Sequence, residues 1–189
     1  MDSVETLQRV IDETQRVVDN VKPEQLADKT PCTEWTVRDI INHITGGATM
    51  VRESLELGSV SPERLGQLMG GDNVGDDCAG AFRRAATQVM AAVRVPGALE
   101  KMVVLPFGEM PGAAAVGMGI FDVTTHACDI ARATGQTITD EQLVEIALAA
   151  GKQMVGPEMR APGVFEDEVP VASDAPAMDR LLAFAGRRT

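Results

Sequence analysis

Two histidines and one aspartate are the residues whose types and spacing best fit metal chemistry. The chain has only two histidines, His43 and His126, and Asp122 lies four residues before the second. Four residues along an α-helix turn through about 40°, so Asp122 and His126 leave the same helix face. Carboxylate and imidazole are both ligands of divalent metals. If the helix that carries His43 lies beside theirs, these three ligands leave one coordination position open, as in catalytic metal sites.

The same spacing has a simpler interpretation. An aspartate and a histidine four residues apart also form an ordinary ion pair on a helix surface. On a helical wheel His43, Asp122 and His126 lie at the edge of their apolar faces, which is compatible with solvated side chains. No catalytic residue beyond the three metal ligands is assigned, and the sequence does not identify cofactor-binding residues.

The cysteines offer weaker candidates for chemistry. Cys32 and Cys128 could act as nucleophiles or extra metal ligands, but buried, unreactive thiols are the expected case. The total of three cysteines is odd and their spacings are wide. This argues against a disulfide framework and fits a reducing cytoplasm. A Gly-x-Ser-x-Gly nucleophile motif is absent, and the glycine pair Gly46-Gly47 lacks the strand and loop of a phosphate site.

Composition limits the class of protein. A length of 189 residues with 44% hydrophobic residues fits one globular domain over residues 1–189. Only 3% of the residues are aromatic, so small aliphatic side chains must fill the core, which favours packed helices. The net charge of −11 speaks against nucleic acid or an anionic membrane as partner. The N-terminus lacks the apolar region of a signal peptide, and no apolar run is long enough to span a membrane, so we expect a cytoplasmic protein.

Hydrophobic periodicity predicts the elements that must position the candidate ligands. Apolar residues recur with helical spacing in most of the chain, while residues 101–107 are short and β-branched and indicate a hairpin or strand-like crossover. Residues 58–75 and 155–174 are rich in Gly and Pro and indicate loops, the first with a short helix at 63–68. Together these patterns predict an all-α, antiparallel four-helix bundle with a long crossover and extra C-terminal helices. The helices are expected at 3–21, from Thr33 or Thr36 to 57, 76–95, 113–134, 140–154 and 177–186.

Two segments resemble a known family. Residues 30–44, TPCTEWTVRDIINHI, and residues 121–136, FDVTTHACDIARATGQ, each contain one of the histidines. They resemble motifs of the DinB-like superfamily, and in particular its actinobacterial branch related to the metal-binding domain of mycothiol-dependent maleylpyruvate isomerase. The C-terminal segment 174–187 is similar to the end of that branch. The resemblance follows the same order along most of the chain.

This resemblance implies a four-helix bundle with a divalent metal, zinc or alternatively nickel. His43 matches the ligand on the second helix, Asp122 a ligand that is Glu in the isomerase, and His126 the ligand four residues later. Related enzymes use a low-molecular-weight thiol such as mycothiol or bacillithiol, which binds the metal as thiolate. Cys128 stands where many relatives have Trp. The residues after the fifth helix are too few for the separate C-terminal domain of the isomerase, which argues against maleylpyruvate isomerisation itself.

Two functions and one simpler alternative follow. The first is an enzyme, a metal- and mycothiol-dependent transferase or isomerase that acts on a small electrophile, with Asp129 or Glu34 supporting the ligands. The second is a non-catalytic metal- or thiol-binding module in stress response or regulation. The third is a helical protein without metal. An apolar, solvent-accessible pocket beside the metal would favour the enzyme. The protein is expected to be a monomer or a homodimer.

Overall fold

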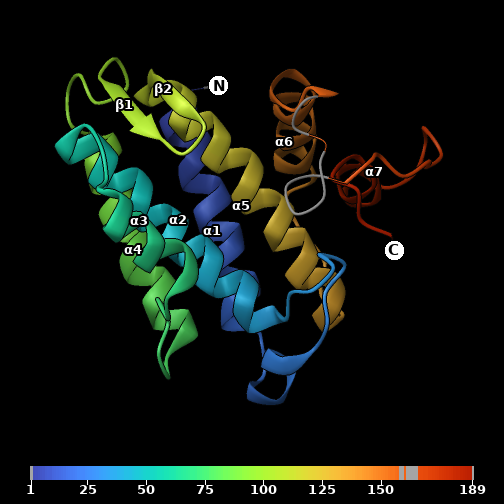
Figure 1. The fold of residues 1–189 in the computed structure, drawn as a ribbon. Coiled ribbons are helices and arrows are strands. Elements are labelled where there is room, and N and C mark those ends of the chain that lie inside the picture. Colours follow the sequence, from blue (N-terminus) through green and yellow to red (C-terminus); the bar gives the residue numbers. More distant parts are fainter. Residues whose placement is uncertain (1, 158–159, 161–165, 189) are drawn as a thin grey trace.

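Four long helices form the body of the computed structural model, which describes residues 2–157, 160 and 166–188. Each of them packs against two of the others, so that they close a ring (Figure 1). The predicted all-α four-helix bundle is confirmed. In the order of the ring the helices are α1 (Ser3–Asp19), α5 (Gly112–Thr134), α2 (Val37–Leu57) and α4 (Cys78–Val93).

Short-range hydrogen bonds fix the start of the helix that carries His43. The Asp39 amide donates to Thr36 Oγ1 and the Thr36 amide donates to Asp39 Oδ2, which is a reciprocal capping box. Of the two threonines predicted as caps, Thr36 is therefore the one used. The helix ends at Gly58, whose φ of 91° favours glycine. At α1 the cap is Asp2, one residue before the predicted Ser3.

The connections before and after α2 contain more structure than the sequence predicted. Helix α3 (Pro62–Gly70) is longer than the predicted segment 63–68 and packs against α2. The approach is close, because a Cβ atom on Gly46 would lie 2.3 Å from the carbonyl oxygen of Leu68. A short 3-10 helix, η1 (Pro23–Ala27), was not predicted.

The predicted hairpin is confirmed. Strands β1 (Met102–Leu105) and β2 (Gly108–Pro111) pair antiparallel, with Val103 opposite Met110. The Val104 amide also donates to the carbonyl of Gly58, which ties the hairpin to the end of α2. The hairpin therefore lies against the bundle immediately before α5 begins.

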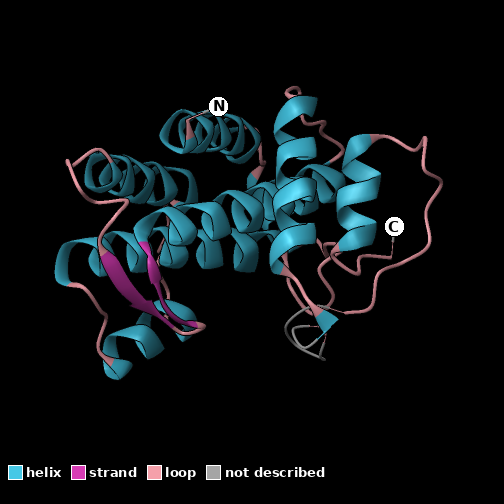
Figure 2. Cartoon of the chain, turned by 90° about the horizontal axis from the view of Figure 1, so that it is seen from above, coloured by secondary structure: helices cyan, strands magenta, loops and turns pink. Residues whose placement is uncertain are grey.

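Two helices follow the bundle, α6 (Glu141–Met154) and α7 (Ala177–Phe184). They lie on the side of the bundle away from the hairpin (Figure 2). They share a second apolar cluster with α5, in which Phe121 and Phe184 make an edge-to-face contact at 6.2 Å between ring centroids. Among the described residues no helix is both long and apolar enough to cross a membrane.

Candidate metal centre

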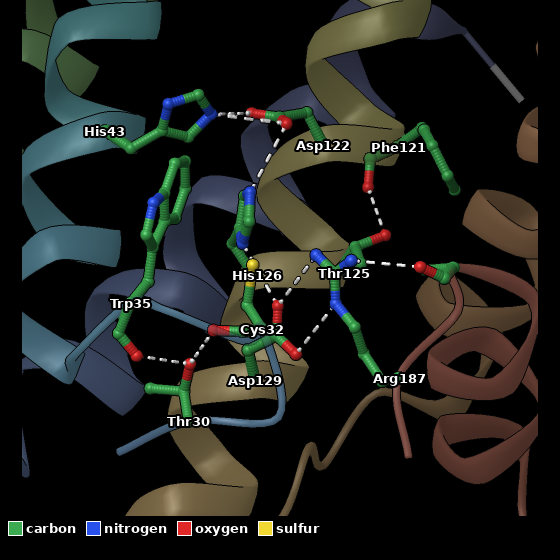
Figure 3. A network of polar contacts seen from close by, with 11 residues as sticks. Thr30, Cys32, Trp35, His43, Phe121, Asp122, Thr125, His126, Asp129 and Arg187 are labelled. Atoms are coloured by element: carbon green, nitrogen blue, oxygen red, sulfur yellow. Dashed lines mark hydrogen bonds and ion pairs between the residues drawn. The ribbon is translucent and has the colours of Figure 1, made fainter. Parts of the chain in front are cut away.

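The packing of α2 against α5 brings His43 to Asp122 and His126 (Figure 3). Nε2 of His43 lies 3.4 Å from Oδ2 of Asp122, and Nε2 of His126 lies 3.5 Å from Oδ1 of Asp122. One donor atom from each residue can be chosen so that all three lie within 4.8 Å of one another. The three residues could meet only if the helix that carries His43 lies beside the helix that carries Asp122 and His126. The two helices are neighbours, so this condition is met.

These separations suit a shared ion better than direct hydrogen bonds. A hydrogen bond from an imidazole nitrogen to a carboxylate is normally about 2.7–2.9 Å long. Two ligands that each lie about 2.0–2.1 Å from a tetrahedral zinc ion are separated from one another by about 3.3–3.4 Å. The separations of 3.4 and 3.5 Å match this second value. Two nitrogen donors and one carboxylate are also a donor set that zinc prefers, so the residues fit such an ion.

The three side chains differ in their access to solvent. The side chains of His43 and Asp122 are 26% and 40% exposed, whereas that of His126 is 7% exposed. The alternative of a solvated side chain was wrong for His126, because Trp35 and the loop before α2 cover it. An ion held here would be reached from the side of His43 and Asp122.

A buried carboxylate holds the far side of the His126 ring. Nδ1 of His126 lies 3.1 Å from Oδ2 of Asp129, and Asp129 is fully buried. A carboxylate only accepts hydrogen bonds, so Nδ1 carries a proton, and in the neutral ring Nε2 presents its lone pair toward Asp122. This carboxylate–histidine arrangement is the usual support of a histidine metal ligand. Asp129 was one of the two predicted supporting residues.

Arg187 was not found by sequence reasoning, which assigned it no role. Its guanidinium spans both carboxylate oxygens of Asp129, each at 3.4 Å, from the segment after α7 (Figure 3). The Arg187 side chain is 10% exposed. The positive charge compensates the buried carboxylate, which would otherwise be costly. No local sequence pattern could have indicated this contact, because 58 residues separate its partners.

Trp35, the only tryptophan of the chain, forms one wall of the site. Its ring lies 4.8 Å from the His43 ring and 5.5 Å from the His126 ring, centroid to centroid. The backbone of Trp35 is held because Thr30 Oγ1 donates to the Trp35 carbonyl. Trp35 belongs to the first motif, so the sequence contained a signal for it, although no role was predicted.

The charges of the site act on one another. Burial lowers the pKa of His43, but the charge and hydrogen bond of Asp122 outweigh this effect and leave the pKa raised. Burial raises the pKa of Asp122, but the two imidazoles, and more weakly Arg187, lower it to about 2. Asp122 is therefore ionised at every pH at which the protein is expected to work. A positive charge, whether a proton on His43 or a metal ion, is favoured beside it.

The remaining candidates from the sequence do not fit a reactive role. Burial raises the pKa of the Cys32 thiol to about 11, although Arg187 opposes it, and burial also raises the pKa of Cys128. Thiolates at these positions are thus disfavoured near neutral pH. Cys32 does lie near His126 and Asp129, but the Nδ1 atom it would share is already bonded to Asp129. Glu34 is exposed in a turn with a φ of 82°, and its predicted support of the ligands finds no contact among the described residues.

A cavity of about 560 Å³ lies beside His43 and Asp122, between α2, α4, α5 and the hairpin. Both ligand side chains line it, whereas His126 does not. Its volume is in the range of sites for small organic molecules. A molecule in this cavity would meet the open side of the candidate metal site.

Comparison with known proteins gives consistent matches. Residues 7–131 match the family model of the mycothiol maleylpyruvate isomerase N-terminal domain. Two uncharacterized proteins of Mycobacterium tuberculosis, from strains CDC 1551 and H37Rv, are each 37% identical to the chain over 189 residues, covering 99% of it and 98% of their own length. They therefore share nearly its whole length.

Solved structures share the fold. The crystal structure of the mycothiol-dependent maleylpyruvate isomerase aligns with a TM-score of 0.65 at 18% identity, over 78% of this chain and 65% of that chain. A histidine-to-alanine mutant of the isomerase aligns with the same TM-score at 17% identity and the same coverage. The match spans slightly less than two thirds of the isomerase chain, and at this identity it establishes the DinB-like fold alone.

Proposed function

The chain belongs to the mycothiol maleylpyruvate isomerase N-terminal domain family, and from this premise we propose that it is a metal- and thiol-dependent enzyme that transfers a low-molecular-weight thiol such as mycothiol to a small electrophile, or isomerises that electrophile. The observation that carries the proposal is the position of His43, Asp122 and His126 at the wall of a cavity of about 560 Å³. A module that binds the metal alone would not need such a cavity.

His43, Asp122 and His126 would hold the metal, with zinc as the first choice and nickel as the alternative. A bound divalent ion would lower the pKa of a coordinating thiol and so supply a nucleophile near neutral pH. The chain would contribute three protein ligands only, so that one position is left for the thiol.

The surrounding residues would prepare the ligands for this task. Asp129 would fix the tautomer of the neutral His126 ring in which Nε2 faces Asp122 with a lone pair, and Arg187 compensates the charge of Asp129. Asp122 would balance the charge of the ion, and its low pKa keeps it ionised. Trp35 covers the imidazoles on the side away from the cavity and limits the access of water.

Metal analysis combined with a transfer assay tests this proposal. The wild type should bind zinc stoichiometrically and conjugate mycothiol to members of an electrophile panel. Asp122→Asn should lose most of the zinc and the transfer together, because the ligand charge is removed. Asp19→Asn is the matched control, since it removes a similarly exposed carboxylate that forms an ion pair with Arg83 on the surface. Zinc and thiol binding without turnover on any electrophile would support the non-catalytic module instead.

A further inference from the structure

We propose that the cavity beside His43 and Asp122 accepts an uncharged, apolar molecule, so that the electrophile is hydrophobic and not a carboxylic acid. This inference rests on the proposed function for its reaction, but the cavity itself can be tested without turnover. It follows from the lining of the cavity, from two glycines next to the ligands and from the exposed residues at its mouth.

The described residues that line the cavity include no arginine or lysine. Apart from His43 and Asp122, every described residue that lines it is aliphatic, aromatic, Met, Pro or Gly. A carboxylate that entered would lose its hydration and find no arginine, lysine or polar side chain to replace it. Arg187 does not line the cavity and is already occupied by Asp129. The net charge of −11 would repel an anion further, and Asp122 would offset the charge of a proton on His43 or of an ion held beside it.

Two glycines line the cavity on the helical turns next to those that carry His43 and Asp122. Gly47 lies one helical turn after His43, and Gly119 lies one turn before Asp122. Both line the cavity, and a Cβ atom built on either would meet nothing within 4 Å. A larger side chain at these positions would occupy space directly beside the ligands. An apolar molecule in the cavity can therefore place its reactive atom next to the candidate metal site.

The mouth of the cavity is apolar as well. Phe107, at the tip of the hairpin, is 60% exposed, and Met69, on α3, is 39% exposed. Both also line the cavity. Exposed hydrophobic side chains that gather at one place are typical of ligand-binding sites. Their position gives an apolar molecule a continuous apolar path from the surface to the interior.

The same lining indicates which of the two substrates the cavity holds. The hydroxyl groups of a sugar thiol such as mycothiol would lose hydrogen bonds to water in an apolar cavity. The electrophile is thus assigned to the cavity, and the polar part of the thiol to a place outside its apolar lining.

A binding experiment with a matched pair of competitors tests the charge preference. N-phenylnaphthylamine, an uncharged probe whose fluorescence rises in apolar surroundings, should bind the purified wild-type protein. Dibutyl maleate should displace it, whereas the maleate dianion should compete at least about tenfold less well, since its charges lose their hydration. Both molecules contain the same electrophilic double bond. Displacement by maleate at equal or lower concentration would overturn the proposal.

A pair of glycine variants tests whether the probe binds in the cavity. Gly119→Leu should weaken binding of the probe about tenfold or more by filling the cavity. Gly117→Leu is the control, because Gly117 lies on the same helix, also has open space around it and does not line the cavity. Gly47→Leu repeats the test from α2. Undiminished probe binding in folded Gly119→Leu and Gly47→Leu proteins would overturn the assignment of the cavity.

Zinc content, measured on the same samples, separates the two proposals. If the wild type prefers dibutyl maleate but holds no zinc, the proposed function fails and the assignment of the cavity stands. If it holds zinc but binds neither probe nor ester, the assignment of the cavity fails and the metal site stands.

Discussion

Nδ1 of His126 lies 3.1 Å from Oδ2 of the fully buried Asp129, and this contact fixes which nitrogen of the ring faces Asp122. Because Asp129 accepts a hydrogen bond from Nδ1, the lone pair of Nε2 in the neutral ring points toward the other two candidate ligands. The contact links the metal site to the C-terminal segment, since Arg187 binds the same carboxylate.

Asp129→Asn should weaken zinc binding about 10- to 100-fold, the usual cost of losing a residue that supports a metal ligand. Asparagine has the same shape, but it removes the charge that favours a proton on Nδ1 and leaves Arg187 without its carboxylate. Calorimetric titration with zinc measures the effect. Asp179→Asn, which removes the surface partner of Arg132, should bind zinc like the wild type. Equal zinc affinity of both variants would rule out a supporting role for Asp129.

Zinc affinity should fall as the pH is lowered, because protons compete with the metal for the imidazoles. The raised pKa of His43 means that this competition begins above the ordinary histidine value of roughly 6.5. Asp122, with a pKa of about 2, stays ionised and does not contribute to the pH dependence of the zinc affinity. Zinc titrations at mildly acidic and mildly alkaline pH give the comparison. The same affinity at both would remove the histidines from the set of ligands.

Asp122→Asn should lower the pKa of His43 in the metal-free protein. The charge and hydrogen bond of Asp122 are the effects that raise this pKa, and burial, which lowers it, remains in the variant. Protonation of His43 also stabilises the folded wild type at acidic pH, and this gain is lost as the pH rises through the raised pKa. NMR titration of the His43 ring measures the pKa. The fluorescence of Trp35, 4.8 Å away, should follow the same transition.

A His43 pKa that stays the same or rises in Asp122→Asn would contradict this account of the site. Asp19→Asn serves again as the control, since its carboxylate pairs with Arg83 away from both histidines. The chain has one Trp and no Tyr, so the fluorescence signal can be assigned to Trp35 without further variants.

Cys128→Ser should keep both zinc and thiol transfer, because the nucleophile is proposed to be an external thiol. Burial raises the pKa of Cys128 and that of Cys32, so neither is a ready nucleophile. The change buries a hydroxyl in an apolar cluster and should cost about 1–3 kcal/mol of stability, which thermal unfolding will show. Loss of transfer in a folded variant that still holds zinc would point to an internal cysteine nucleophile.

The sequence by itself determined the local elements and the identity of the candidate ligands. Helical periodicity located the bundle helices within a few residues, and the spacing of Asp122 and His126 predicted that both side chains leave one helix face. These inferences succeeded because they depend on the 3.6-residue period, which acts over a single turn. The short helix η1, at Pro23–Ala27, was missed because it has too few residues to show a period.

Only the tertiary structure decided how these parts meet. It made α2 and α5 neighbours, which brought His43 to Asp122 across 79 positions of sequence, and it buried His126 against Asp129 and Arg187. It also left open space at Gly47 and Gly119. A glycine in a sequence shows only that a side chain is missing, and not whether space remains there. Each of these contacts joins distant segments, and their formation depends on how whole helix faces pack, which no local pattern encodes.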